Sequence, residues 1–204
     1  MNTSRTIKVL SLVLFAFASV GLTGCYTDTV DSFSTLTFQL PVNRQFGMKN
    51  IRFSGTTSEE AVSTTRVDLR EYEIYRDNQE NIRIVDLFQL GYWFDTLAGN
   101  PSLGDAEFEF IELYLRLIDE KEEYLLGRYE NVVAREYYKR LHIISTSDNI
   151  PQGILDSINR NPQFDMILRL SRPTSRRDSL TFPIIIDTIS SNVDLVVRLE
   201  GNLW

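Results

Sequence analysis

Two side chains in this sequence have types suited to nucleophilic or general-base chemistry, and each occurs once. Cys25 is the only thiol and His142 is the only imidazole among the 204 residues. A triad of the Ser-His-Asp type would have to use His142, which lies between Leu141 and Ile143 in an apolar run. No Gly-x-Ser-x-Gly motif occurs anywhere in the chain. We therefore expect a structural histidine, no catalytic residues, and a protein that is not an enzyme.

Carboxylates and metal ligands are the next candidates for chemistry. Glu107 and Glu109 alternate with phenylalanines, as on the solvated face of a sheet, and the acidic residues 119–123 are predicted to form a turn. The polar turn at 77–81 could hold a cation only weakly. One histidine together with Cys25 is too few ligands for a zinc site. The sequence therefore predicts no metal site and no cofactor.

Cys25 ends a segment with three recognisable parts. Arg5 and Lys8 give a basic start, residues 9–20 are apolar apart from two serines, and the motif Leu22-Thr23-Gly24-Cys25 follows. This arrangement resembles the signal sequence of bacterial lipoproteins, in which the last four residues form the lipobox. The resemblance implies cleavage before Cys25, a diacylglycerol on its sulfur and usually a third acyl chain on its amino group.

Two other interpretations fit this segment less well. The apolar core at 9–22 is shorter than the roughly 20 residues that a transmembrane helix needs. A secretory signal without lipid does not require the only cysteine at the cleavage point. We therefore predict a cleaved signal peptide at 1–24, a lipidated tether at 25–31 and a single folded domain at 32–204.

The predicted location follows from the lipid and from the next residue. Two or more acyl chains hold a protein firmly on a membrane that it does not span. Tyr26 follows Cys25, whereas an aspartate there would, in some bacteria, mean retention in the inner membrane. The resemblance therefore implies anchoring in the cell envelope, at the outer membrane.

The charge of the chain limits its partners. The first 24 residues hold two of the 21 basic residues and none of the 28 acidic ones, so the remainder carries a net charge of −9. A surface of that sign is repelled by nucleic acids and by anionic headgroups. No nucleic-acid partner is expected, and the membrane is expected to be reached through the lipid on Cys25.

Strands are predicted where β-branched and aromatic residues alternate or form short apolar runs. The run at 82–94 is apolar on both faces at its centre, which predicts a central strand, with a bulge expected at Gly91. Pro41 directly follows the run at 33–40, and a proline fits the end of a strand or an edge strand. The predicted strands are 33–40, 48–54, 82–94, 106–118, 124–134, 164–170, 180–186 and 193–203.

The segments between these strands are predicted less uniformly. Residues 55–65 are expected to be a polar loop containing one capped helical turn, and 96–104 a second loop. A short helix is expected at 154–158. Two segments stay open. Residues 67–76 fit either a short helix or a bent strand, and residues 135–144 fit either a helix or a strand.

These elements predict a mainly β fold, an antiparallel β-sandwich that is immunoglobulin-like or similar, with one or two short helices. The order of strand, basic loop, strand, turn and final strand at 164–203 resembles that of small immunoglobulin-like envelope domains. This resemblance covers no functional motif.

Three aromatic residues are the candidates for binding a ligand or a partner: Tyr92, Trp93 and Trp204. A tyrosine or tryptophan at a loop end can stack on a sugar or anchor a partner protein. We expect a membrane-anchored lipoprotein that acts as a non-catalytic interaction or assembly module, with an envelope protein as its partner. The alternative is a binding protein for an apolar or carbohydrate ligand.

Overall fold

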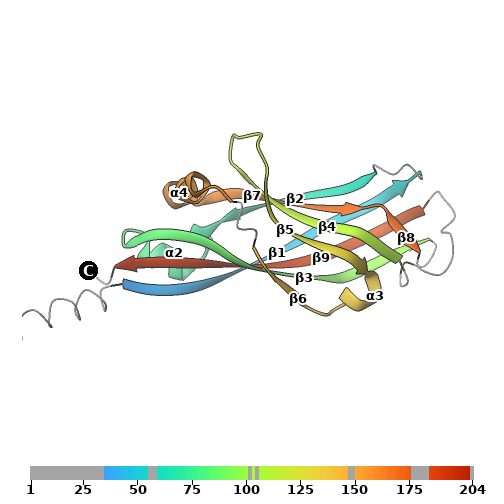
Figure 1. Ribbon diagram of the computed structural model, residues 1–204, viewed down its shortest axis with the longest axis horizontal. Coiled ribbons are helices and arrows are strands. Elements are labelled where there is room, and N and C mark those ends of the chain that lie inside the picture. Colours follow the sequence, from blue (N-terminus) through green and yellow to red (C-terminus); the bar gives the residue numbers. More distant parts are fainter. Residues whose placement is uncertain are drawn as a thin grey trace, which may run out of the picture.

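The computed structural model describes residues 35–54, 59–100, 103, 106–146, 150–175 and 184–202. Cys25, the predicted signal and tether, and Trp204 lie outside the described residues. The described part is an elongated pair of facing sheets with short helices at its ends (Figure 1). The predicted mainly β fold is confirmed.

Strands account for most of the described chain, and the helices are short. The strands are β1 (Thr35–Phe53), β2 (Glu60–Asp68), β3 (Ile82–Asn100), β4 (Ala106–Leu117), β5 (Tyr124–Val133), β6 (His142–Ser145), β7 (Gln163–Ser171), β8 (Pro173–Ser175) and β9 (Ile184–Asn202). The helical elements are the 3₁₀ turn η1 (Leu69–Glu71), α2 (Glu73–Asn78), α3 (Ala134–Tyr137) and α4 (Gln152–Arg160).

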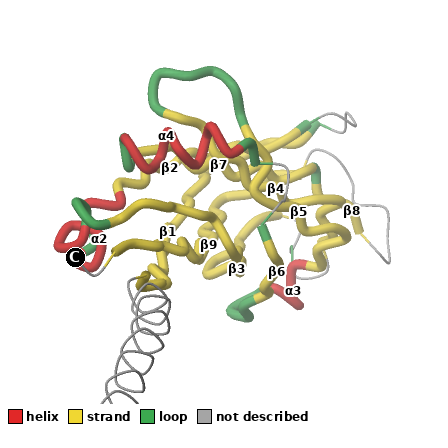
Figure 2. The backbone as a smooth tube through the Cα atoms, turned by 60° about the vertical axis from the view of Figure 1, so that its left-hand side comes forward, coloured by secondary structure: helices red, strands yellow, loops and turns green. Residues whose placement is uncertain are grey.

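The strands form two sheets. The first sheet has the order β1-β9-β3-β6, and the second has the order β2-β7-β4-β5, with β8 also paired to β4. All pairings between these strands are antiparallel, so the predicted antiparallel β-sandwich is confirmed. Figure 2 shows α3 beside β6, on the side of the sandwich away from α2 and α4.

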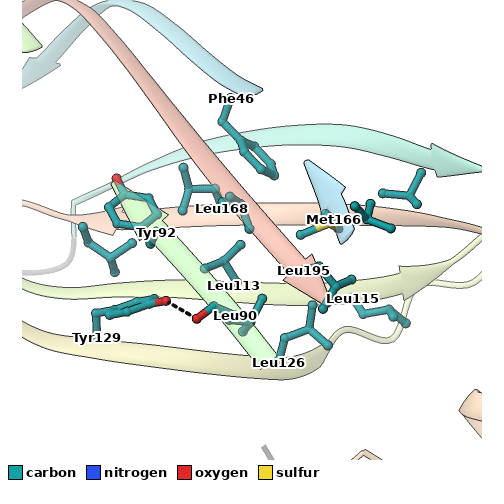
Figure 3. Packing of buried hydrophobic residues seen from close by; sticks show 14 of the residues in the cluster. Phe46, Leu90, Tyr92, Leu113, Leu115, Leu126, Tyr129, Met166, Leu168 and Leu195 are labelled. Carbon is teal, nitrogen blue, oxygen red and sulfur yellow. Dashed lines mark hydrogen bonds between the residues drawn. The ribbon is translucent and has the colours of Figure 1, made fainter. Parts of the chain in front are cut away.

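The core lies between the sheets and follows the period-2 alternation of the strands. Leu195, Val197 and Leu199 of β9 are all buried, as the sequence pattern predicted. All three belong to the same buried cluster as Leu113 and Leu168 of the second sheet, and Figure 3 shows Leu195 beside these residues. Because the chain has no cysteine besides Cys25, this buried apolar area, at about 25 cal/mol per Å², is the main source of stability.

The first strand is longer than the sequence pattern indicated. The two runs predicted at 33–40 and 48–54 belong to one strand, β1, which pairs with β9 from Thr35 to Phe53. Pro41 lies within it, opposite Val196. This is tolerated because β1 is at the edge of the first sheet, where one side needs no ladder hydrogen bonds.

Glu60 and Ala61 lie in a strand and not in the predicted capped helical turn, and residues 60–65 of the predicted loop belong to that strand. Glu60 begins β2, and Ala61 and Val67 are buried against the core. Pairing with β7 along the whole of β2 outweighs the local capping signal. The ambiguous segment 67–76 contains the end of β2, then η1 and the start of α2.

β3 lies between β9 and β6, so the predicted central strand is confirmed. It continues to Asn100, through part of the loop predicted at 96–104, because it stays paired with β9. The bulge expected at Gly91 is wrong, since Gly91 pairs regularly with Asp194 and Ile143. One register shift instead lies between Leu87 and Gln89 and exchanges the two faces of the strand.

The segment at 135–144, whose sequence pattern fits either a helix or a strand, contains a helix followed by a strand. It starts within α3, passes through a short loop and enters β6 at His142. The helix predicted at 154–158 is confirmed as α4. The last two predicted strands are joined in β9, which begins at Ile184.

Candidate functional site

His142 is a structural residue of the segment between α3 and β6. Its ring stacks on Tyr137 with centroids 3.7 Å apart and planes at 15°. Its Nε2 lies 3.1 Å from the carbonyl oxygen of Glu136, and its own carbonyl accepts a hydrogen bond from the Tyr129 hydroxyl at 3.2 Å. These contacts close the loop from 136 to 142.

The carboxylates on the outer face of the second sheet are held in ion pairs. Asp165 accepts from Arg66 and from Arg116, each at 3.0 Å. Glu112 accepts from Arg128 at 2.7 Å and from the Tyr114 hydroxyl at 2.8 Å. Antiparallel register produces these rows, because directly opposite residues on neighbouring strands share a face.

The ion pairs and hydrogen bonds of Glu112 and Asp165 leave these carboxylates poorly suited to act as a catalytic acid pair. Burial and the hydrogen bond to Glu112 raise the pKa of Tyr114 to about 12, so its hydroxyl stays protonated and donates. Each carboxylate is engaged by an arginine on the adjacent strand. The geometry therefore supports a role in stabilising the sheet face.

The two acidic turns show no metal centre. Within the part of the chain that the structure describes, no three His, Cys, Asp or Glu side chains come together as a metal site. In the predicted turn 119–123, Glu123 binds Arg169 at 2.5 Å. At 77–81, Arg76 lies 3.7 Å from Asp77, which already balances part of the charge of that turn.

The fold places two of the three predicted aromatic site residues, Tyr92 and Trp93, on opposite faces of β3. Tyr92 is fully buried, and its hydroxyl lies 2.8 Å from that of Ser191, so its ring is not at the surface. Burial raises its pKa. Trp93 is half-buried and points to the opposite, outer face of the first sheet. Trp204 lies outside the described residues, as does Cys25.

An exposed surface that the sequence did not indicate lies next to Trp93. Tyr138, Leu141 and Ile143 are 45%, 50% and 55% exposed, and Lys139 and Arg140 between them are also exposed. We call the exposed side chains of residues 138–141 and Ile143 the 138–143 surface; the His142 side chain is not part of it. It joins α3 to β6, at the free edge of the first sheet.

The 138–143 surface is anchored on β3 at two points. The Lys139 N–H donates to the Phe94 carbonyl at 2.8 Å, and Lys139 itself has a positive φ of 53°. Leu141 lies directly over Gly91: a Cβ at Gly91 would be 2.6 Å from Leu141 Cδ1. The absence of a side chain at Gly91 therefore lets Leu141 cross the outer face of the sheet.

A cavity of about 490 Å³ opens on the other side of Tyr138. It lies between the far half of β3 and α3, with mainly apolar walls and one arginine. The lining residues are Leu97, Ala98, Gly99, Leu103, Ala134, Arg135 and Tyr138. A volume of this size suits a small apolar ligand or one large side chain of a partner.

The comparisons with known proteins identify no relative. No family model and no curated protein matches the sequence. Solved structures that align include the decameric BFDV capsid protein (10% identity, 80% of this chain, 99% of that chain, TM-score 0.35). The structure of infectious bursal disease virus Gx strain aligns at 8% identity over 83% of this chain and 32% of that chain, with a TM-score of 0.32. The structure of FLHE aligns at 9% identity over 79% of this chain and 97% of that chain, with a TM-score of 0.24. Scores this low carry no argument about function.

The described helices are all short. None of them is long and apolar enough to cross a membrane.

Proposed function

We propose that this chain is a lipid-anchored protein of the cell envelope, at the outer membrane, whose sandwich domain is a non-catalytic interaction module. The motif Leu22-Thr23-Gly24-Cys25 supports the anchor. The observation that supports the interaction role is the 138–143 surface, where Leu141 and Ile143 are half exposed on an ordered loop. A contiguous group of exposed apolar side chains is typical of protein interaction sites.

The anchor is tested by Cys25→Ser, with Tyr26→Phe as the matched control. A serine hydroxyl is not a substrate for thiol acylation, so the variant loses the acyl chains, each worth about 0.8 kcal/mol per buried CH₂. Fractionation with detergent phase separation should find Cys25→Ser in the aqueous phase and the control with membranes. Membrane retention of Cys25→Ser after a high-salt wash would refute the anchor.

The interaction role is tested by co-purification from solubilised membranes. Ile143→Glu places a charge in the 138–143 surface, and Val62→Glu is a matched control because Val62 is 53% exposed on the second sheet. We expect one stoichiometric partner with the wild type and the control, and its loss with Ile143→Glu. A wild-type protein that always purifies as a clean monomer contradicts the role.

The cavity favours a second candidate function, the binding of a small apolar ligand. Ala98 is an exposed lining residue, so Ala98→Phe should fill the space at little cost to the fold. Native mass spectrometry of the purified protein should then show a co-purifying apolar compound in the wild type and none in Ala98→Phe. A wild type without any bound compound, or the same bound compound in both proteins, would remove this candidate.

A further inference from the structure

The 138–143 surface is part of a continuous apolar strip on the outer face of the first sheet. Ile143 lies directly opposite Gly91 in the β3–β6 ladder, and Leu141 covers Gly91 from above. Trp93 is two residues further along the same face of β3. Three apolar side chains from β3, β6 and the loop before β6 therefore lie on this face around a residue without a side chain, and Asp194 of β9 flanks that residue on its other side.

The same surface carries two cations. Lys139 and Arg140 are exposed, and among the described residues neither is within ion-pair distance of a carboxylate. The arginines of the second sheet differ, since Arg116 and Arg169 are both bound to Glu123. The contact of the Lys139 ammonium is with the Tyr138 ring, 5.4 Å from its centroid.

These cations stand out against the charge of the molecule. The chain after residue 24 has a net charge of −9, so this pair of cations is opposite in sign to the chain as a whole. Positive charge beside apolar side chains complements a segment that alternates carboxylates with apolar residues. The overall negative charge opposes approach to anionic lipids or nucleic acids.

The loop that carries this surface is already ordered. The Tyr137–His142 stack closes it, the Lys139 N–H is bound to Phe94, and the Tyr129 hydroxyl donates to the His142 carbonyl. Binding therefore costs little loop entropy, which leaves more of the interaction energy for affinity. Beside the loop, β6 pairs with β3 and is the last strand of its sheet, so an extended chain has an edge to follow.

We propose that the 138–143 surface binds an extended, acidic and apolar segment of a partner protein. Apolar side chains of that segment pack on Leu141, Ile143 and Trp93, and its carboxylates pair with Lys139 and Arg140. The proposal rests on the interaction role proposed above and adds the chemistry of the partner.

The test uses the full-length lipidated protein in zwitterionic detergent micelles and fluorescence anisotropy. The probe is a labelled peptide of alternating glutamate and valine, and the comparison peptide has lysine in place of glutamate. We expect the acidic peptide to bind and the basic one not to bind. Raising the salt from about 0.05 M to about 0.5 M should weaken binding, because exposed charges are screened.

Charge reversal identifies the site. Lys139→Glu/Arg140→Glu should weaken binding of the acidic peptide at least tenfold. The matched control is Arg83→Glu/Arg160→Glu, which changes the net charge equally at two exposed arginines elsewhere and should shift binding much less. Equal effects of the two double variants, or equal binding of the two peptides, would overturn the proposal.

Two further outcomes point to other occupants and also overturn it. Binding to phosphatidylglycerol vesicles but not to the peptide, lost in Lys139→Glu/Arg140→Glu, would identify a lipid surface. Concentration-dependent dimers in sedimentation, abolished by the same variant, would identify a second copy. If Ile143→Glu loses the co-purified partner while neither peptide binds, the interaction role stands and the acidic chemistry fails.

Discussion

One pair of buried hydroxyls, on Tyr92 and Ser191, limits what can replace either residue. Tyr92 and Ser191 are both fully buried and bind each other across β3 and β9. Burying a hydroxyl is tolerable only when it keeps a partner. The sequence placed Tyr92 among candidate binding residues because period 2 cannot show which face of a central strand meets the second sheet.

The first prediction concerns that pair. Tyr92→Phe should lower the free energy of unfolding by about 1–2 kcal/mol, because the Ser191 hydroxyl keeps its burial and loses its partner. Tyr92→Phe/Ser191→Ala should recover part of the loss. Urea denaturation of the single and double variants measures the coupling, and strictly additive changes would show that the two hydroxyls do not depend on each other.

The second prediction concerns acid stability. Hydrogen bonds from Arg70 lower the pKa of Asp68 against the opposing effect of burial. Burial works against ionisation of Asp165, but hydrogen bonds from Arg66 and Arg116 outweigh it and lower its pKa. Unfolded aspartate has a pKa of about 3.9, so the unfolded state binds more protons near that pH. Stability should be fully present above about pH 4 and fall as the pH drops toward the folded-state values.

Asp165→Asn tests this assignment. The variant should be less stable than the wild type at pH 7, and its stability should fall less on acidification. Asp187→Asn, at an exposed position of β9, serves as the control. Urea midpoints between about pH 7 and pH 3 give the comparison, and parallel curves for wild type and Asp165→Asn would contradict it.

At the scale of elements, strands with one clear alternation were predictable and irregular ones were not. β4, β7 and α4 lie where the sequence patterns placed them. β3 changes face at the register shift between Leu87 and Gln89, one of four in its pairing with β9, so a single period-2 pattern cannot describe its faces along the whole strand. β2 was missed because most residues between Ala61 and Val67 are polar, and only the pairing with β7 shows that this segment is a strand.

The candidate surface was harder to predict than the fold. Leu141 and Ile143 are apolar, and an apolar run normally indicates the interior. Their exposure arises because β6 is the outermost strand of its sheet and because Gly91 leaves room for Leu141 on the outside. Both causes depend on residues far from 138–143 in the sequence, so the pattern of that segment alone cannot predict the exposure.

The third prediction compares two glycines in paired strands. A Cβ at Gly91 would meet the end of the exposed Leu141 side chain, whereas at Gly201 it would lie 2.6 Å from the Asn81 carbonyl oxygen. A side chain can move and a paired backbone cannot do so cheaply. Gly91→Ala should change the free energy of unfolding by less than about 1 kcal/mol, and Gly201→Ala should cost about 1–3 kcal/mol. Thermal and urea unfolding measure both, and the opposite order would contradict the contact geometry.

At the scale of the whole molecule, the first and last described strands pair with each other along their lengths. β1 and β9 pair from Thr35 opposite Asn202 to Phe53 opposite Ile184, and β9 pairs with β3 on its other side. The start of β1 and the end of β9 therefore lie at the same end of the sandwich (Figure 1). The chain must close its longest loop before the first sheet is complete, which favours slow folding.

The last prediction follows from that closure. A chain starting at Tyr26 should fold with the stability of the full domain, because every strand of the sandwich lies after it. A chain starting at Val42 loses the first part of β1, including the buried Leu40, and leaves β9 without a β1 partner from Val196 to Asn202. The second chain should be unfolded or aggregated, because an open edge of that length pairs with other chains. Circular dichroism with size-exclusion chromatography tests both chains. Failure of the first to fold would show that the anchor and the fold depend on each other, and cooperative folding of the second would show that the β1–β9 ladder is dispensable.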